Sequence, residues 1–393
     1  MRKLIVLVIL FLSVTNVICL TNFALISSLI NPAASDVAFG LNSGAADIYN
    51  MNPLSAWSNP AKLGYQKGLS YGYSHDPYLE DTFSDIYMRS SYLSFGWNGI
   101  GILMPAPSAE SRWGNVMSFG TQEYIDHEGN LISSFESYES SSKFAVGVNT
   151  IEFATNFINN DFIKNLTFYG DISLGYNYDI LYSKLGPSTG VTDHSNGTAE
   201  SHSSGYGIIG RLSPFNQYNA TNQFYRLDFT AGLYLLNPEK NRVTYNGSLP
   251  SEPLPYGTRS AFSGKFSLDL KIIPSFDNSD IRNFIDNIIT VYYSQDNAQY
   301  GEEEKQNPGT WGEGLEITFF DFFSIRKGKY IDRKGELIGD TDGMGFNLNY
   351  KDIIQFQYNL VEFPGGGLQN RQDKTDFLFR IDLLRSYNLV KGK

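Results

Sequence analysis

The sequence predicts an all-β protein, an antiparallel transmembrane β-barrel of about fourteen strands with an N-terminal plug segment. Three observations lead to this prediction. The chain of 393 residues is rich in Phe (28), Tyr (26) and Gly (37), a composition typical of strands and turns. Several long stretches alternate between apolar and polar residues. After the first residues, no apolar run approaches the roughly twenty residues that a membrane-spanning helix needs.

The N-terminus has the pattern of a secretory signal peptide, which we place at residues 1–19. Met1-Arg2-Lys3 supplies the positive charge, and the apolar run 4–12 is too short to cross a bilayer. Cleavage after Cys19 is one interpretation, and lipidation of Cys19 is the alternative, although Ile18 is large for that position. Cys19 is the only cysteine, so a mature chain without it contains no disulfides.

Residues 20–66 are rich in small residues and lean towards helix, which predicts a compact plug. Gly40, Gly44, Ala45 and Ala46 would let such a segment tuck inside a barrel. Asn59-Pro60-Ala61 would break the segment before the first strand. A barrel of about fourteen strands encloses a lumen wide enough to leak, so something must fill it. The alternative is a disordered or peripheral arm.

Residues 67–393 carry the alternating stretches, for example 166–178, 226–235, 262–272 and 376–383. Successive side chains of a strand point to opposite faces, so each stretch has one apolar and one polar face. A soluble β-sandwich would show the same period. The stretches span about nine to thirteen residues, the length of a tilted membrane strand, and aromatic residues gather near their ends. These two features favour the barrel.

Individual strands are expected between turn signals such as Asn98-Gly99 and Lys351-Asp352. The candidates are 69–75, 90–97, 100–106, 114–124, 140–149, 167–178, 204–211, 226–236, 260–272, 287–295, 311–319, 322–331, 343–350, 353–362 and 375–384, with 130–138 as a further possibility. Bacterial single-chain barrels have even strand numbers, so the fifteen candidates must include one that is wrong, or 130–138 must be a sixteenth strand. We prefer a count of fourteen.

The polar faces of these strands carry full charges that are expected to face the lumen. They are Asp171, Asp228, Lys265, Asp269, Lys271, Arg380 and Asp382. Such charges could line a transport path, or they could pair across strands and rigidify the barrel. Both signs alternate along the strands, which favours pairing.

Two parts of the chain resemble a known family. One is the run Ala38-Phe-Gly-Leu-Asn-Ser-Gly-Ala-Ala-Asp-Ile-Tyr49 with Trp57-Ser-Asn-Pro-Ala-Lys-Leu63. The other is 311–328, which contains Trp-Gly-Glu-Gly-Leu and Ile-Arg-Lys-Gly, with Gly343-Met-Gly-Phe346. Together they resemble the FadL superfamily of outer-membrane barrels, in its PorV-like branch. The chain departs from that pattern at Phe39-Gly-Leu-Asn42 and in its ending, Leu-Val-Lys-Gly-Lys, which lacks a terminal aromatic residue.

The resemblance implies a protein of the bacterial outer membrane, in contact with its lipid, and two alternative functions. In the first, hydrophobic small molecules enter the lumen, displace contacts of the plug and leave sideways through a gap in the wall. In the second, which is PorV-like, the barrel conducts little and serves as a docking or shuttle component for secreted protein cargo, with a secretion translocon as partner.

Other functions have little support in the sequence. The net charge of −11 argues against nucleic acid as a partner. Gly205-Tyr-Gly-Ile-Ile-Gly210 lacks the βαβ context of a nucleotide site. A loop with His194 and His202 could suggest a hydrolase or metal site, but it has no ligand spacing. We therefore expect no enzymatic activity, no catalytic residues, no cofactor and no metal site.

Overall fold

The computed structural model describes residues 25–40, 47–49, 51–77, 85–109, 112–125, 128, 130–158, 161, 169–186, 197–214, 224–245, 251–273, 280–301, 309–332, 337–364 and 371–390. The expected signal peptide lies outside these ranges, as do Gly44, Ala45, Ala46 and His194.

Most of the described chain is strand. The long strands are β1 (Gly68–Pro77), β2 (Ile86–Trp97), β3 (Ile100–Pro105), β5 (Arg112–Ile125), β6 (Leu131–Asn149), β7 (Gly170–Lys184), β8 (Thr198–Leu212), β9 (Tyr225–Leu236), β12 (Gly257–Asp269), β13 (Asn287–Tyr300), β14 (Thr310–Phe319), β15 (Phe323–Asp332), β16 (Leu337–Tyr350), β17 (Ile354–Pro364) and β18 (Arg371–Ile381). Short strands are β4 (Pro107–Ala109) and the separate pair β10 (Arg242–Val243) and β11 (Glu252–Pro253).

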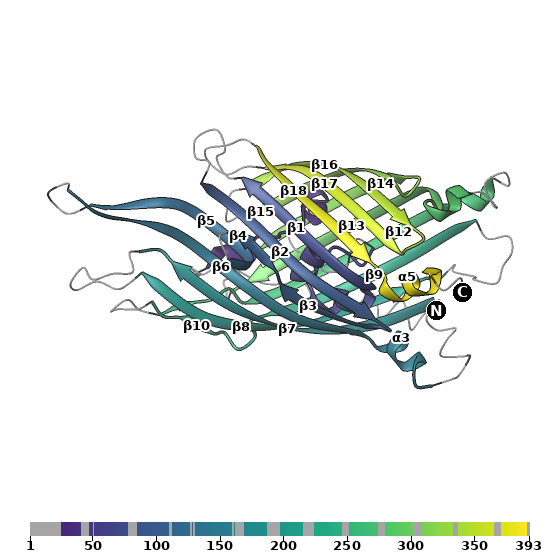
Figure 1. Cartoon of the computed structure of the whole chain (residues 1–393), viewed down its shortest axis with the longest axis horizontal. Helices are drawn as coiled ribbons and strands as arrows, with labels where there is room; N and C mark the ends of the chain where they lie inside the picture. Colours follow the sequence, from purple (N-terminus) through teal and green to yellow (C-terminus); the bar gives the residue numbers. More distant parts are fainter. Residues whose placement is uncertain are drawn as a thin grey trace.

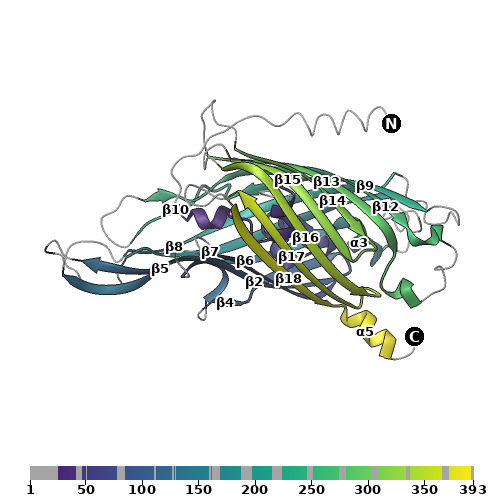
Figure 2. The same ribbon diagram turned by 90° about the horizontal axis from the view of Figure 1, so that it is seen from above.

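These strands form one antiparallel sheet that closes on itself (Figures 1 and 2). The first strand pairs with the last, in a register that runs from Leu69 opposite Ile381 to His75 opposite Thr375. On its other side β1 pairs with β2, so no edge is left open there. The predicted closed antiparallel barrel is confirmed.

The wall has fourteen positions, as predicted, because β3 and β5 share one of them. β3 pairs with the half of β2 that ends at Trp97, whereas β5 pairs with the half that begins at Ile86. The same division holds on the other side: β3 pairs with the part of β6 from Ala145 to Val148, and β5 pairs with the part from Leu131 to Ser141. The fifteen candidate strands are therefore all strands, but two of them make up a single wall position, the third. The further candidate 130–138 is the first half of β6.

The tight turns gather at one end of the barrel. Asn98-Gly99 and Lys351-Asp352 both have positive φ at each of the two residues, the type I′ geometry that suits a two-residue hairpin. Phe320-Asp321 has the same geometry. These turns and the C-terminus lie at one end, which we call the turn end; the other we call the loop end. In outer-membrane barrels the short turns face the periplasm.

The outer face of the wall is apolar at every position. Large exposed side chains occur on all fourteen, for example Leu69, Phe95, Ile102, Phe144, Leu174, Tyr206, Leu235, Phe266, Tyr293, Leu315, Ile325, Phe346, Phe356 and Phe379. The side chains between them point inward and are mainly polar, as on β7, where Ser173, Asn177 and Asp179 are buried. We call the outer ring the apolar belt. A continuous belt of this kind needs lipid to cover it.

The N-terminal segment, which comprises the described residues between 25 and 66, lies inside the barrel. It contains η1 (Ile26–Leu29), α2 (Ala34–Ala38), η2 (Pro53–Trp57) and η3 (Pro60–Tyr65). α2 contacts β15 to β18, η2 contacts β1 and β2, and η3 contacts β3 and β6 to β8. Contacts on all these sides of a closed wall place the segment in the lumen, where the ribbon in purple tones runs in Figures 1 and 2.

Short helices lie at the turn end of the barrel. They are α3 (Thr150–Thr155), η4 (Leu270–Ile272), η6 (Asp280–Asn283) and α5 (Leu383–Val390), which follows the last strand. Within the described residues, no helix is long and apolar enough to cross a membrane.

Candidate functional site in the barrel lumen

Asn59, Pro60 and Ala61 initiate η3 and fasten it to the wall. The side chain of Asn59 accepts a hydrogen bond from the Ala61 backbone N–H at 3.0 Å, and Pro60 occupies the first helical position. The Asn59 amide also donates to the carbonyls of Ile208 (3.4 Å) and Leu233 (3.2 Å) on β8 and β9. The expected break of the chain at Asn59-Pro60 therefore lies between η2 and η3.

A row of glycines on neighbouring strands provides the seat for η3. Gly96, Gly101, Gly147, Gly175 and Gly207 face one another in register across β2, β3, β6, β7 and β8. A Cβ at any of them would collide with the chain between Asn59 and Gln66. We call these five residues the glycine row. Without side chains, the wall backbone lets η3 approach directly.

Gly40 lies against the opposite side of the wall. Its φ of 70° is in the left-handed region, and a Cβ there would meet the backbone of Lys329 on β15. The neighbouring Phe39 rests on Gly314 and Gly328, which pair with each other on β14 and β15. The N-terminal segment is thus in direct backbone contact with both sides of the barrel.

Buried charges connect α2 to the wall. Asp376 on β18 accepts hydrogen bonds from the backbone N–H groups of Ala34 (2.7 Å) and Ser35 (3.4 Å), at the start of α2. Its other oxygen accepts from Asn359 at 2.6 Å. Asn359 in turn accepts from Arg326 at 2.7 Å, so a chain of polar contacts links residues on β15, β17 and β18 and passes across β16.

Two ion pairs lie fully inside this region. Lys62 of η3 is 3.5 Å from Asp36 of α2, and both side chains are 0% exposed. Lys374 of β18 is 2.7 Å from Asp76 of β1 and also donates to the carbonyl of Asn31. Burial raises the pKa of Asp36 to about 7, against the opposing effect of the Lys62 charge. No local sequence pattern predicts these pairs, because their partners are far apart along the chain.

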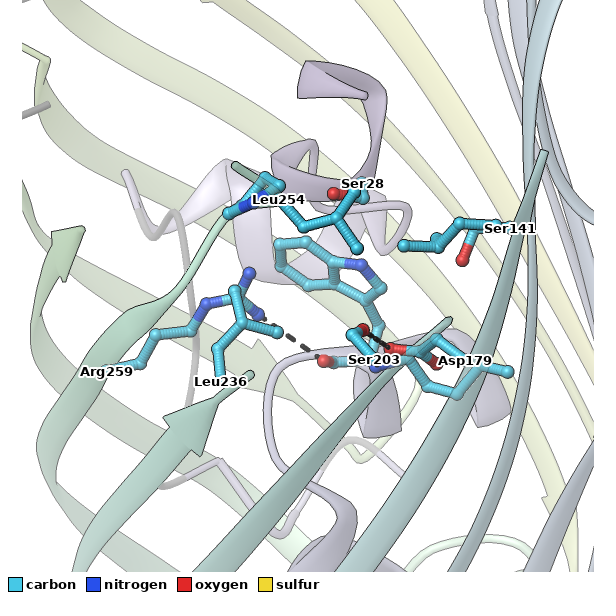
Figure 3. Close-up of a pocket in the computed structure, with 11 residues that line it drawn as sticks. Ser28, Ser141, Asp179, Ser203, Leu236, Leu254 and Arg259 are labelled. Carbon is cyan, nitrogen blue, oxygen red and sulfur yellow. Dashed lines mark hydrogen bonds and ion pairs between the residues drawn. The ribbon is translucent and has the colours of Figure 1, made fainter. Parts of the chain in front are cut away.

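A small cavity lies between the N-terminal segment and the wall, towards the loop end. Figure 3 shows Asp179 and Ser203 on one side of it, Arg259 on another, and Leu254 and Ser28 above. Lys143 completes the polar lining, 3.3 Å from Asp179. The cavity encloses about 10 Å³, which is room for about one water molecule. In this state the lumen holds no space for a larger ligand at that position.

Arg259 is a charged side chain of this cavity that is only 1% exposed. Its guanidinium lies 3.8 Å from the ring of Trp57 and donates to the Trp57 carbonyl at 3.4 Å and to the Tyr300 hydroxyl at 3.1 Å. A cation stacked on an indole ring out of contact with water is a strong contact. Arg259 therefore fastens η2 to β12. The sequence analysis did not include this arginine among the candidate residues, because it lies just before the predicted strand 260–272.

The wall is interrupted at its third position. β3 pairs with β6 only as far as Leu103 opposite Ala145, and β5 resumes at Asn115 opposite Ser141. Ser142, Lys143 and Phe144 of β6 therefore have no ladder partner on that side, within the described strands. Across this break, Tyr92 of β2 donates a hydrogen bond from its hydroxyl to the Ser141 carbonyl at 3.2 Å. No sequence signal other than Pro105 and Pro107 marks the site.

The predicted lumen charges occupy several environments. Asp171 faces inward and binds Arg211 and the Tyr65 hydroxyl, each at 2.5 Å. Asp228 is 2.7 Å from Arg226, and Lys265 lies 4.5 Å from the ring centre of Tyr49.

The remaining four predicted charges lie near the turn end. Asp269, the last residue of β12, accepts from the Lys271 backbone N–H and from Arg282. Lys271 is in η4 and is exposed, which differs from the expectation for a lumen residue. Arg380 is 3.8 Å from Asp352. Asp382 follows β18 and accepts from the Arg385 backbone N–H at the start of α5, again outside the wall.

The histidines come together at no site in the described chain. His75 lies on β1 beside Arg89, and His202 lies on β8, stacked on Tyr178 on the outer face. Among the described residues, no group of three or more His, Cys, Asp or Glu is arranged to hold a metal ion.

Comparisons with known proteins give matches among solved structures only. No protein-family model and no curated protein matches the sequence. A FadL homologue of Pseudomonas aeruginosa matches with a TM-score of 0.37 and 8% identity, over 89% of this chain and 98% of that one. The CymD monoaromatic hydrocarbon channel gives 0.34 and 11%, over 90% and 98%. The P. putida toluene transporter TodX gives 0.34 and 10%, over 89% and 97%. At such values the matches do not establish a family.

The location of the protein follows from its own wall. A closed antiparallel barrel leaves no backbone group unpaired towards lipid except at local breaks, and the apolar belt surrounds it completely. Barrels of this kind span bacterial outer membranes. The chain is a protein of the bacterial outer membrane.

Proposed function

We propose that the barrel passes hydrophobic small molecules from the loop end into the membrane through the break in its third wall position. The observation that carries this proposal is the missing ladder at Ser142, Lys143 and Phe144. Among the long strands described, the other interruptions of the ladders are register shifts, on β5 between Ser118 and Thr121 and between Tyr124 and Ile125, and on β12 between Leu268 and Asp269. Three successive residues of β6 lack partners at the third wall position, so the wall can part there at a small cost in hydrogen bonds.

The contents of the lumen support a sideways route. The N-terminal segment contacts the wall on many sides, and its residues Ala33, Leu54, Ala61 and Leu63 are buried. A molecule that entered from the loop end would meet this segment before it reached the turn end. An exit through the side avoids any displacement of η3 from the glycine row.

The lining of the break is apolar on the side of β2 and β3, whereas Lys143 of β6 adds a buried charge that is paired with Asp179. Tyr92, Leu103 and Ala145 belong to one buried cluster with Leu54 and Leu63 of the N-terminal segment. Ala106, at the break itself, is 1% exposed. Apolar walls with a few polar groups are typical of sites for hydrophobic ligands. The Tyr92 hydroxyl, bound to the Ser141 carbonyl, holds the two sides together in this state.

Two substitutions of opposite effect test the route. Ala106→Trp fills the break and should lower the uptake of N-phenyl-1-naphthylamine into vesicles that contain the protein by several-fold. Tyr92→Phe removes the hydrogen bond across the break and should raise uptake. Ala231→Trp on the outer face of β9 is the matched control and should leave uptake unchanged. Equal uptake by all four proteins, each first shown to be folded, would refute the sideways route.

A second candidate is the PorV-like role, in which the barrel is a closed docking component for secreted protein cargo. The small cavity beside the N-terminal segment, which has space for about one water molecule, favours it. This role predicts no uptake by the wild-type protein or by Tyr92→Phe. It also predicts that a larger translocon co-purifies with the barrel after gentle extraction.

A further inference from the structure

The last helix of the chain is held to the barrel in an unusual way. α5 begins two residues after β18, and its residue Arg385 binds the β16–β17 turn: the guanidinium is 2.8 Å from the Asp352 carboxylate and 3.1 Å from the Lys351 carbonyl. The helix start is capped by Asp382, which accepts from the Arg385 backbone N–H at 3.0 Å. The contacts to the turn are therefore polar.

Two apolar side chains of α5, Leu383 and Tyr387, lie on the face of the helix opposite Arg385. Leu383 and Tyr387, one turn apart on the same face, are 53% and 56% exposed. In a helix that covers a soluble protein, the apolar face packs on the protein and the polar face meets water. α5 has the reverse arrangement, since its polar residue Arg385 faces the protein. Leu383 and Tyr387 together form an exposed apolar patch on α5, the kind of surface that marks a contact with lipid or with another apolar partner.

The surroundings of α5 indicate what that surface is. The neighbouring outer faces of β1, β17 and β18 carry exposed Leu69, Ile354 and Phe379, which belong to the lipid-covered belt. α5 continues β18 past the wall at the turn end, as Figure 2 shows. Its apolar face is thus adjacent to the edge of the belt.

Other large apolar side chains at the turn end are exposed to a similar degree. Phe320 and Phe322 in the β14–β15 turn and Phe284 beside η6 are exposed, by 47%, 47% and 45%. Aromatic side chains at this level form the interfacial girdle of membrane barrels. The boundary between lipid and water therefore lies at the level of these turns, where α5 also begins.

We propose that α5 contacts the periplasmic surface of the outer membrane, with Leu383 and Tyr387 inserted among the lipids and Arg385 anchored to the barrel. This lipid-binding helix is a further interaction surface, separate from the proposed transport.

Site-directed spin labelling of the full chain tests this proposal. In a Cys19→Ser background, single cysteines replace Tyr387 on the apolar face or Ser386 on the adjacent flank, and the proteins are reconstituted in phosphatidylethanolamine–phosphatidylglycerol vesicles at low protein density. We expect the label at position 387 to be reached by oxygen and protected from a water-soluble nickel complex. The ratio of the two accessibilities should be several-fold higher at position 387 than at position 386.

Three outcomes would overturn the proposal. Equal accessibility of both labels to nickel would show that the helix lies in water. Protection of position 387 from both oxygen and nickel would show that protein covers it. Protection that appears only at high protein density would identify a second copy of the chain as the partner. Failure of solute uptake has no bearing on these results, so the two proposals are tested independently.

Discussion

Single charged residues in the lumen have environments that the folded chain creates. Asp36 and Lys62 are 26 positions apart in the sequence, yet they form a pair with no exposure to water. Removing one partner of such a pair leaves an isolated buried charge, which costs about 3–5 kcal/mol. Arg259, stacked on Trp57, is a second example. Both contacts fasten the N-terminal segment rather than the wall, so we expect them to control how readily the segment moves.

Asp36 should make stability depend on pH. Its pKa is raised by burial from 3.8 to about 7 in the folded protein, so between these values the folded state holds a proton that the unfolded state has released. The free energy of unfolding should therefore fall as pH rises from 4 to 7, by up to about 1.4 kcal/mol per pH unit.

The double substitution Asp36→Asn with Lys62→Met should reduce that slope without leaving an unpaired charge. Unfolding by urea in detergent micelles or vesicles, measured at several pH values, gives the comparison. A slope that is unchanged in the double variant would show that Asp36 does not titrate in this range.

At the level of elements, the position of η3 depends on the glycine row, and the row in turn is covered by η3. The Asn59-Pro60-Ala61 turn has its own capping signal, but its position depends on five strands that each place a glycine at the same height. Ser173 adds a hydrogen bond from its hydroxyl to the Ala61 carbonyl at 2.6 Å. The helix and this part of the wall therefore fold as one unit.

Gly175→Ala should destabilise that unit. The added methyl group would collide with the backbone of Pro60 and Ala61, and overpacking of this kind costs about 1–3 kcal/mol. Gly210→Ala on β8 is the matched control, because a Cβ there meets no other atom within 4 Å. Thermal unfolding should show a lower midpoint for the first variant and an unchanged or higher one for the second. The same midpoint for both would mean that η3 does not rest on the row.

For the molecule as a whole, the apolar belt decides where the protein resides. Towards the loop end, the outward side chains of the strands change from apolar to charged, and the apolar belt ends there. On β17, for example, the outward side chains are Ile354, Phe356 and Tyr358 and then, nearer the loop end, Glu362. Outward charges at that upper level pair with each other, as Arg371 does with Asp342 (2.9 Å) and Glu362 (3.1 Å). This level is the expected boundary of the lipid on the loop side.

A charge placed within the belt should weaken the barrel in proportion to its depth. Phe356→Arg should cost about 2 kcal/mol or more of folding free energy in vesicles, because an arginine near the bilayer middle loses its hydration. Glu362→Arg, on the same face of the same strand, should cost about 0–1 kcal/mol. Guanidinium titration in vesicles measures both. Equal costs would show that lipid does not surround this face.

Much of this architecture could be predicted from the residues alone. Alternation with a period of two, turns such as Asn98-Gly99 and the length of the strands depend only on near neighbours in the chain. They determined the all-β class, the fourteen wall positions and the location in a membrane. The small residues of the N-terminal segment predicted that it is compact, although part of that stretch lies outside the described residues.

Only the tertiary structure shows what occupies the lumen and where the wall is interrupted. The shared position of β3 and β5, the glycine row, the stack of Arg259 on Trp57 and the reversed α5 all depend on residues that are distant in sequence and adjacent in space. A local pattern carries no record of which strand will lie opposite another. Barrel closure sets that register, because it brings the first strand to the last and the N-terminal segment into the space between them.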